Sequence, residues 1–179
     1  MKSTRFNITI ALILCFGIHS LLFSQNKNSV EYNFQVDKVL EERITSYSEL
    51  EDVFKYDTAD TLKMMYLANK SKEITYMEGQ SFALCNLGIY FRDKSFYNRS
   101  IAYHQNAYNL ALSTKNIDLQ VINLNMLGVV SRRTDNNIKA IEYHQEALKI
   151  AENQKETSKN LKKSIAVSYN SIGNIYLTL

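Results

Sequence analysis

Two histidines, His104 and His144, are the side chains whose type and spacing could support chemistry. They occupy matching places in two similar segments, residues 101–107 and 141–147, which lie forty residues apart. Imidazoles on two equivalent helices could share a metal ion. Neither histidine has a carboxylate or a cysteine four residues further on, and two ligands alone seldom form a metal site. The sequence therefore favours packing roles for both histidines and predicts no metal site.

Cys85 is the other candidate for chemistry. It has no adjacent histidine or cation to lower the pKa of its thiol, which predicts an inert apolar residue. The chain has no phosphate-binding glycine loop, no His-Glu-x-x-His, no Gly-x-Ser-x-Gly and no cysteine pair at metal spacing. We expect no catalytic residue and no cofactor, and hence no enzyme.

The elements that carry these residues have helical apolar spacing. Small and apolar residues recur three and four positions apart in four segments, which form two pairs. The first pair is 84–91 with 101–111, and the second is 121–128 with 141–151. Polar stretches at 93–95 and 134–137 separate the members of each pair. The chain has no proline, five glycines and 22% charged residues, which suits a helix-rich protein. An all-α fold follows.

A repeat organises these helices. A Leu-Gly pair stands at the same distance before each histidine segment, and a third start, Ile172-Gly173, follows near residue 179. Glycine in a helix costs about 1 kcal/mol relative to alanine, so its recurrence at one phase indicates close helix packing. Gly88 would face Ser100, and Gly128 would face Ala140.

The pattern resembles the tetratricopeptide repeat, a helix-turn-helix unit. The positions that match it are Leu87, Gly88, Phe91, Ser100 and Ala107 in one unit, Leu127, Gly128, Ala140 and Ala147 in the next, and Gly173 in a third. Ser131 replaces an aromatic, the closing proline is missing, and the units exceed the usual 34 residues. The chain is most similar to the long-helix variety of exported Bacteroidetes-type sensors and regulators. The resemblance implies a right-handed α-solenoid of units of about 40 residues.

The repeat divides the chain into expected segments. Residues 77–116 and 117–155 would form two complete units, and residues 156–179 the first helix of an incomplete third unit. Residues 35–76 would be degenerate capping helices, the first of them spanning 36–54. Residues 25–34 would be a flexible leader, and residues 1–24 a signal peptide.

The signal peptide prediction rests on Lys2 and Arg5, which precede a mostly apolar run over residues 8–23. Cleavage near Ser24 would export the protein to the periplasm or cell envelope; the alternative is an uncleaved membrane anchor. Without Lys2 and Arg5, 19 basic residues remain against 18 acidic ones, a net charge of +1. No basic field indicates nucleic acid binding within the chain. A membrane contact is expected only at the signal segment or at a helix beyond residue 179.

The resemblance implies a peptide-binding groove lined by the first helix of each unit. The residues at the corresponding phases are Phe82, Cys85, Ile89, Arg92, Ile122, Asn125, Val129, Arg132, Asn170 and Asn174. Asparagine amides can donate to and accept from a peptide backbone, and arginines can pair with its carboxylates. The alternative is a solvated polar face that binds no peptide.

Two functional hypotheses follow. The first is a non-enzymatic, exported scaffold that binds proteins or peptides. The second is the sensory input region of a larger signalling protein, whose histidine kinase or DNA-binding module would follow residue 179. In either case the helix around Tyr169, Ile172 and Tyr176 lacks a following helix. We expect self-association or fraying at that helix.

Overall fold

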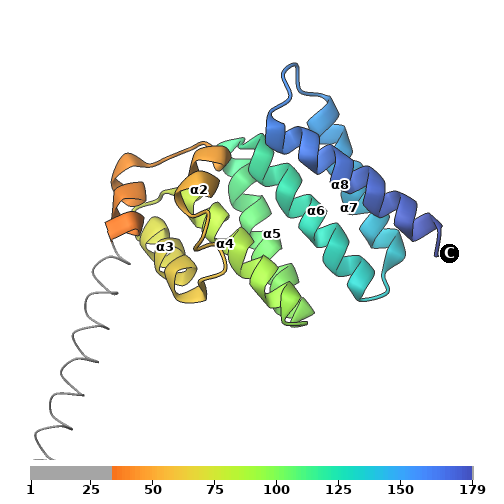
Figure 1. The fold of residues 1–179 in the computed structure, drawn as a ribbon, viewed down its shortest axis with the longest axis horizontal. Coiled ribbons are helices and arrows are strands. Elements are labelled where there is room, and N and C mark those ends of the chain that lie inside the picture. Colours follow the sequence, from red (N-terminus) through yellow and green to blue (C-terminus); the bar gives the residue numbers. More distant parts are fainter. Residues whose placement is uncertain (1–33, 179) are drawn as a thin grey trace, which may run out of the picture. The chain divides into compact units, whose positions relative to one another are not determined.

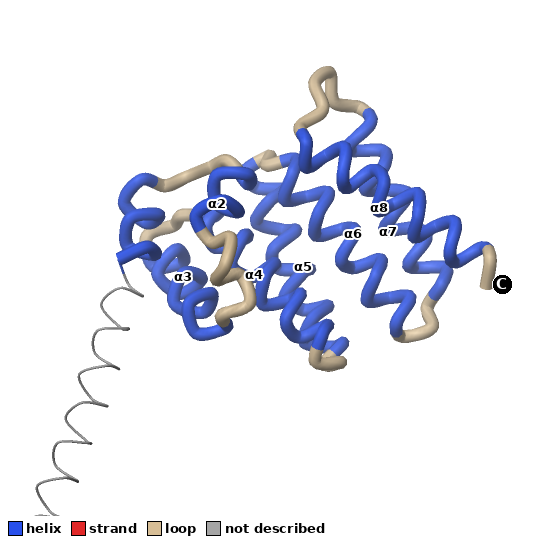
Figure 2. The backbone as a smooth tube through the Cα atoms, viewed as in Figure 1, coloured by secondary structure: helices blue, strands red, loops and turns tan. Residues whose placement is uncertain are grey.

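The computed structural model describes residues 34–178, which form helices joined by turns and loops and contain no strand (Figure 1, Figure 2). The all-α class predicted from the sequence is thus confirmed for these residues. Contacts divide the chain into two compact units between Lys38 and Val39. The predicted signal peptide, and the predicted leader up to residue 33, lie outside the described residues. All helices labelled below belong to the second unit.

Residues 34–42 are helical. The helices after them are α2 (Tyr47–Val53), α3 (Thr61–Glu73), α4 (Met77–Asp93), α5 (Tyr97–Thr114), α6 (Ile117–Arg133), α7 (Asn137–Glu152) and α8 (Lys159–Tyr176). Each of the helices from α3 to α7 packs on the next one in the chain. In addition α4 contacts α6, and α6 contacts α8, so these three form one layer with α5 and α7 packed against it. The result is a helical repeat-like stack (Figure 1).

The turns between these helices share one geometry. The residues Thr75, Ser95, Lys115 and Asp135 lie at twenty-residue intervals, and each has a positive φ, between 54° and 62°. After each of them, the next backbone N–H donates to the carbonyl five residues earlier, as in Asn136 N–H to Ser131 O at 2.9 Å. This is the left-handed ending that closes many helices, here made without glycine.

Side-chain caps fix where several helices begin. Asp60 accepts from the backbone N–H groups of Leu62 and Lys63, both at 3.0 Å, at the start of α3. Asn116, Asn136 and Ser158 accept in the same way at the starts of α6, α7 and α8. Such caps satisfy backbone donors that have no partner within the helix.

The single helix predicted over residues 36–54 is wrong. The helix ends at Arg43, whose φ is 49°, and α2 starts only after Ser46, whose hydroxyl caps it. Contacts to distant turns hold the break: the Arg43 guanidinium donates to Ile74 O at 3.1 Å, and the Asn116 amide donates to Thr45 O at 2.8 Å. These tertiary bonds favour the break over a continuous helix.

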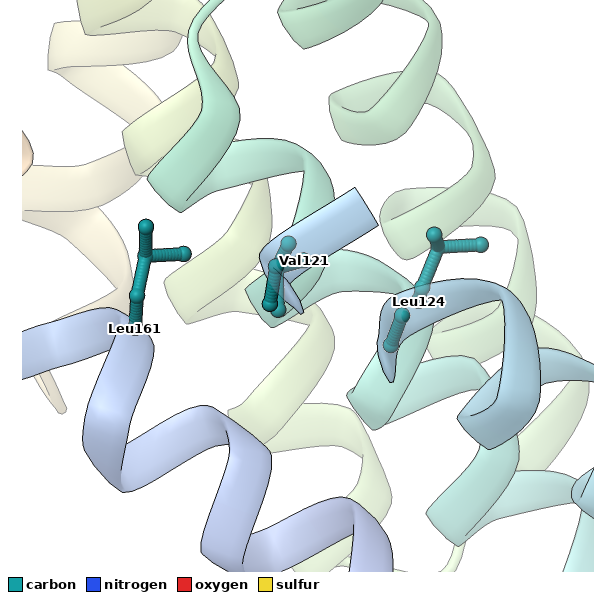
Figure 3. Packing of buried hydrophobic residues seen from close by; sticks show 5 residues of the cluster. Val121, Leu124 and Leu161 are labelled. Atoms are coloured by element: carbon teal, nitrogen blue, oxygen red, sulfur yellow. The ribbon is translucent and has the colours of Figure 1, made fainter. Parts of the chain in front are cut away.

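A cluster of buried apolar residues joins three helices, α6, α7 and α8. Val121 and Leu124 of α6 pack with Leu161 of α8 and with the small residues Ala147 and Ala151 of α7 (Figure 3). Because the alanines add little bulk, α7 can approach α6 closely. The loop at residues 153–158 then connects α7 to α8 (Figure 2).

Candidate functional site

A pocket of about 360 Å³ opens among α2, α4, α6 and α8. It lies wholly within the second unit. Its lining residues are Tyr47, Glu51, Thr58, Ala59, Asn86, Ile89, Tyr90, Asp93, Ile122, Asn125, Met126, Asn160, Lys163, Ser164 and Val167. The layered contacts of α4, α6 and α8 bring these residues together, although they lie far apart in the sequence.

The pocket wall is mainly apolar. Ile89 of α4, Ile122 and Met126 of α6 and Val167 of α8 are all half-buried. Half-burial leaves part of each side chain accessible to an apolar ligand group.

The charged groups of the pocket lie around this apolar wall. Glu51 is half-buried, whereas Asp93 and Lys163 are exposed. Asp93 is held by Arg92, with Nη2 at 2.8 Å from Oδ1. Arg92 also donates to the sulfur of Met126 at 3.0 Å. Arg92 is therefore already engaged beside the pocket, and Glu51 and Lys163 are the charges best placed to meet a ligand.

Only part of the predicted groove converges on this pocket. Ile89, Ile122 and Asn125 line it. Val129 is half-buried, and Arg132, Asn170 and Asn174 are exposed, but none of these four belongs to the lining. The predicted set therefore follows α4 and α6 but misses the part of α8 that faces the pocket.

Phe82 and Cys85 are corrections to the predicted groove. Both are buried, because α2 packs on this part of α4. The Phe82 ring stacks on Phe54 at 5.7 Å and meets Tyr47 at 5.8 Å. Burial raises the pKa of the Cys85 thiol to about 12, against the opposing effect of Arg92. Neither side chain can contact a ligand in the groove.

Asn125 is the third correction, because its amide is already used inside the protein. The Asn125 Nδ2 donates to Ser164 O at 3.0 Å. Its Oδ1 lies 2.8 Å from His144 Nδ1 and accepts from the Ser168 hydroxyl at 2.6 Å. The two bonds to Oδ1 use both acceptor sites of the amide oxygen, and together with the Nδ2 bond they tie α6 to α7 and α8, so Asn125 supports the structure and has no acceptor left for a peptide.

His104 is also buried and bonded to an asparagine, Asn123, whose Oδ1 lies 3.0 Å from Nδ1. Asn123 Nδ2 donates to Leu119 O at 2.8 Å, so its Oδ1 must accept and the His104 Nδ1 must carry the proton. The same reasoning applies to His144 and Asn125. In both rings Nε2 is buried without a hydrogen-bond partner. Because Nδ1 carries the proton, the group left without a partner is the lone pair of Nε2 and not an N–H.

Burial lowers the pKa of both histidines to about 4. Desolvation is the main cause, and the nearby cations add to it, Arg92 for His104 and Arg132 for His144. Both rings are therefore neutral at neutral pH, and their burial keeps them from any substrate. Their chemistry is structural hydrogen bonding.

Metal-ligand clusters and membrane-spanning helices are two further features to consider in the described part of the chain. Among residues 34–178 no three histidine, cysteine or acidic side chains gather as metal ligands would. Within the same range no helix has the length and apolar character needed to cross a membrane.

Sequence reasoning missed that Asn123 and Asn125 bind the two histidines, and it missed the pocket residues contributed by α2. The available signal was the presence of Asn123 and Asn125 in the otherwise apolar stretch of residues 121–130. Buried amides in such stretches need specific partners. Comparison of the chain with models of protein families, with curated proteins and with solved structures finds no match.

Proposed function

We propose that this chain is a non-enzymatic module that binds an extended peptide segment of another protein. The observation that carries the proposal is the pocket of about 360 Å³ formed jointly by α2, α4, α6 and α8. This volume is at the small end of the range for ligand sites and suits one or two side chains of a longer segment.

The proposal includes a right-handed solenoid of tetratricopeptide-like repeats. Its support is the repeated local packing: an added Cβ at Gly88 or Gly128 would lie 2.6 Å from the ring of His104 or His144, respectively. The Ser100 hydroxyl also donates to Gly88 O at 2.8 Å. A stack whose repeats contact mainly their neighbours presents a continuous surface for a polypeptide.

The composition of the pocket indicates which peptide it would bind. Ile89, Ile122 and Val167 favour an apolar side chain at the centre. The Asn160 side chain can bond to the peptide backbone, because an amide both donates and accepts. Glu51 and Lys163 would select a peptide whose flanking charges are of opposite sign.

Peptide selection against the full chain tests this proposal, followed by calorimetric titration of the selected peptides. We expect the selected peptides to share an apolar residue and to lose at least about tenfold in affinity on Ile122→Lys. The Lys163→Glu variant alters an exposed side chain, leaves the fold intact and should change the preferred flanking charge.

Val129→Lys is the matched control, because Val129 lies two turns from Ile122 on the same helix, is equally half-buried and lies outside the pocket. Failure to select any peptide, or equal losses in the Ile122 and Val129 variants, would refute the proposal.

We further propose that the protein is exported from the cytoplasm. The support is the pair Lys2 and Arg5 before the apolar run of residues 8–23. Mass spectrometry of the protein from an expressing bacterium should find a new N-terminus near Ser24 in the cell-envelope fraction. An intact Met1 in the cytoplasmic fraction would refute export.

A further inference from the structure

One end of the peptide pocket is formed by polar side chains of α2 and α4. Tyr47 and Glu51 lie one turn apart on α2, and both line the pocket. Asn86 of α4 belongs to the same end, because it follows Phe82 by one turn and the Phe82 ring meets Tyr47 at 5.8 Å. We call Tyr47, Glu51 and Asn86 the polar end of the pocket.

Asn86 brings a hydrogen-bond acceptor to this end. The residue is buried, and its Nδ2 donates to Phe82 O at 2.9 Å, so the group that remains is the amide oxygen Oδ1. No donor from residues 34–178 reaches this oxygen. Because buried amide oxygens nearly always accept a hydrogen bond, an Oδ1 at a pocket wall suits a ligand that donates one.

Glu51 adds a negative charge to the polar end. Its carboxylate is half-buried and has no ion pair or hydrogen bond within the described part of the chain. Burial raises the pKa of the neighbouring Tyr47 hydroxyl, and the negative charges of Glu51 and Asp118 add to the rise, with no described cation opposing them. The surroundings of the Tyr47 hydroxyl are therefore negative, which favours a positively charged ligand group.

The shape of the pocket favours arginine over lysine as the source of that charge. A guanidinium has several N–H donors in one plane, so it can bond to the Glu51 carboxylate and to Asn86 Oδ1 at the same time. An ammonium is compact and more strongly hydrated, and it loses more on entering a half-buried site. The other lining cation, Lys163, is exposed and can stay in water when a second cation binds.

We propose that the polar end of the pocket binds an arginine side chain of the peptide, next to the apolar residue that occupies the wall. The aliphatic part of the arginine would lie against Ile89 and Ile122, and its guanidinium would meet Glu51 and Asn86. The inference rests on the proposed peptide-binding function and specifies one residue of the peptide.

The test uses the full chain and a library of short peptides that have one fixed leucine and randomised residues on both sides. A second library has serine in place of the leucine. We expect the leucine library to bind better and arginine to be enriched over every other residue, lysine included, at one position beside the leucine. Glu51→Gln should abolish the arginine enrichment and leave the difference between the two libraries unchanged, because the apolar wall stays the same.

Glu49→Gln is the matched control, since it makes the same change on the same helix at an exposed residue outside the pocket. It should leave the arginine enrichment intact. Glu51→Gln should remain folded, because the Glu51 carboxylate has no partner to lose among the described residues. Thermal unfolding of both variants checks this.

Calorimetric titration then compares a selected peptide with a form in which citrulline replaces the arginine, which removes the charge and keeps the shape. The replacement should weaken binding to the unmodified chain at least about tenfold. For Glu51→Gln the same replacement should change the affinity by less than about threefold, because the charge has lost its partner.

Leucine peptides that bind without an arginine preference, or an arginine preference that survives Glu51→Gln, would overturn this inference and leave the peptide-binding function standing. Enrichment of aspartate or glutamate beside the leucine would overturn it too, because Lys163 would then be the group that selects the peptide. No binding from either library would refute the peptide-binding function itself, and this inference with it.

Discussion

At the scale of single residues, His104 and His144 connect neighbouring helices through hydrogen bonds to Asn123 and Asn125. The stack keeps both rings neutral, since a charged imidazole would lose its hydration without gaining a buried counter-ion. This predicts a specific dependence of stability on pH.

The folded-state pKa of each histidine, about 4, lies below the ordinary value of 6.5. Between these values the unfolded chain binds more protons, so the stability is fully present above about pH 6.5 and falls as the pH drops toward 4. Each histidine should contribute a loss on the order of 3 kcal/mol over this range. Urea unfolding at several pH values measures it. His104→Phe should make the pH dependence clearly shallower, and an unchanged slope would contradict this account.

Two of the repeat glycines, Gly128 and Gly173, lie in different environments, so replacing each with alanine should have opposite effects on stability. Gly128→Ala should destabilise the chain by about 1–3 kcal/mol, because the methyl group would overlap the His144 ring. Gly173→Ala meets open space, so the better helix propensity of alanine should stabilise the chain by up to about 1 kcal/mol. Thermal unfolding of both variants tests the difference. If both variants changed the stability in the same direction, the two glycines would not differ in their packing as described.

At the scale of elements, the turns recur every twenty residues with a non-glycine residue in the left-handed region. A side chain in this conformation costs about 1 kcal/mol, less for aspartate and asparagine, whose side chains bond locally. The turns are tolerated because the backbone bonds that close them satisfy the carbonyls at the helix ends.

Lys115→Gly should therefore stabilise the chain by about 0.5–1 kcal/mol, since Lys115 is exposed and its φ is 57°. Asp135→Gly is the matched control at the equivalent turn. It should stabilise the chain by less, because aspartate tolerates the left-handed conformation better than lysine does. Chemical denaturation of the two variants measures both effects. A destabilised Lys115→Gly would mean that the lysine side chain contributes contacts beyond its backbone conformation.

At the scale of the second unit, the most extensive helix contacts join first and second neighbours in the stack. A local loss of packing should therefore spread over a limited range. Val121 of the buried cluster lies on α6, which has helices packed on both sides of it. Leu161 of the same cluster lies on α8, the last of the labelled helices.

Hydrogen exchange should resolve this difference. Val121→Ala should speed amide exchange in the helices that contact α6, from α4 to α8, whereas Leu161→Ala should speed it mainly in α7 and α8. Unmodified chains should already exchange fastest in the last turn of α8, where the predicted fraying would appear. Uniform changes in both variants would indicate that the unit unfolds as a single cooperative body.

The candidate site shows where sequence reasoning failed. Ile89 and Ile122, which the sequence assigns to the groove, do line the pocket. Phe82 and Cys85 have suitable phases too, but α2 covers them. That cover depends on the break after Arg43, which the bond from Arg43 to Ile74 O and the bond from Asn116 to Thr45 O hold in place. No local pattern in residues 36–54 reports these contacts.

The sequence by itself determined the helices and their recurring small residues, because apolar spacing and glycine phase are local properties of the chain. The tertiary structure alone decided which partner each buried polar group takes. Asn123 and Asn125 are two residues apart, and hence about 200° apart around α6. One therefore meets His104 of α5, while the other meets His144 of α7. Their partners depend on which helix packs on each side of α6, and that is settled only when the stack forms.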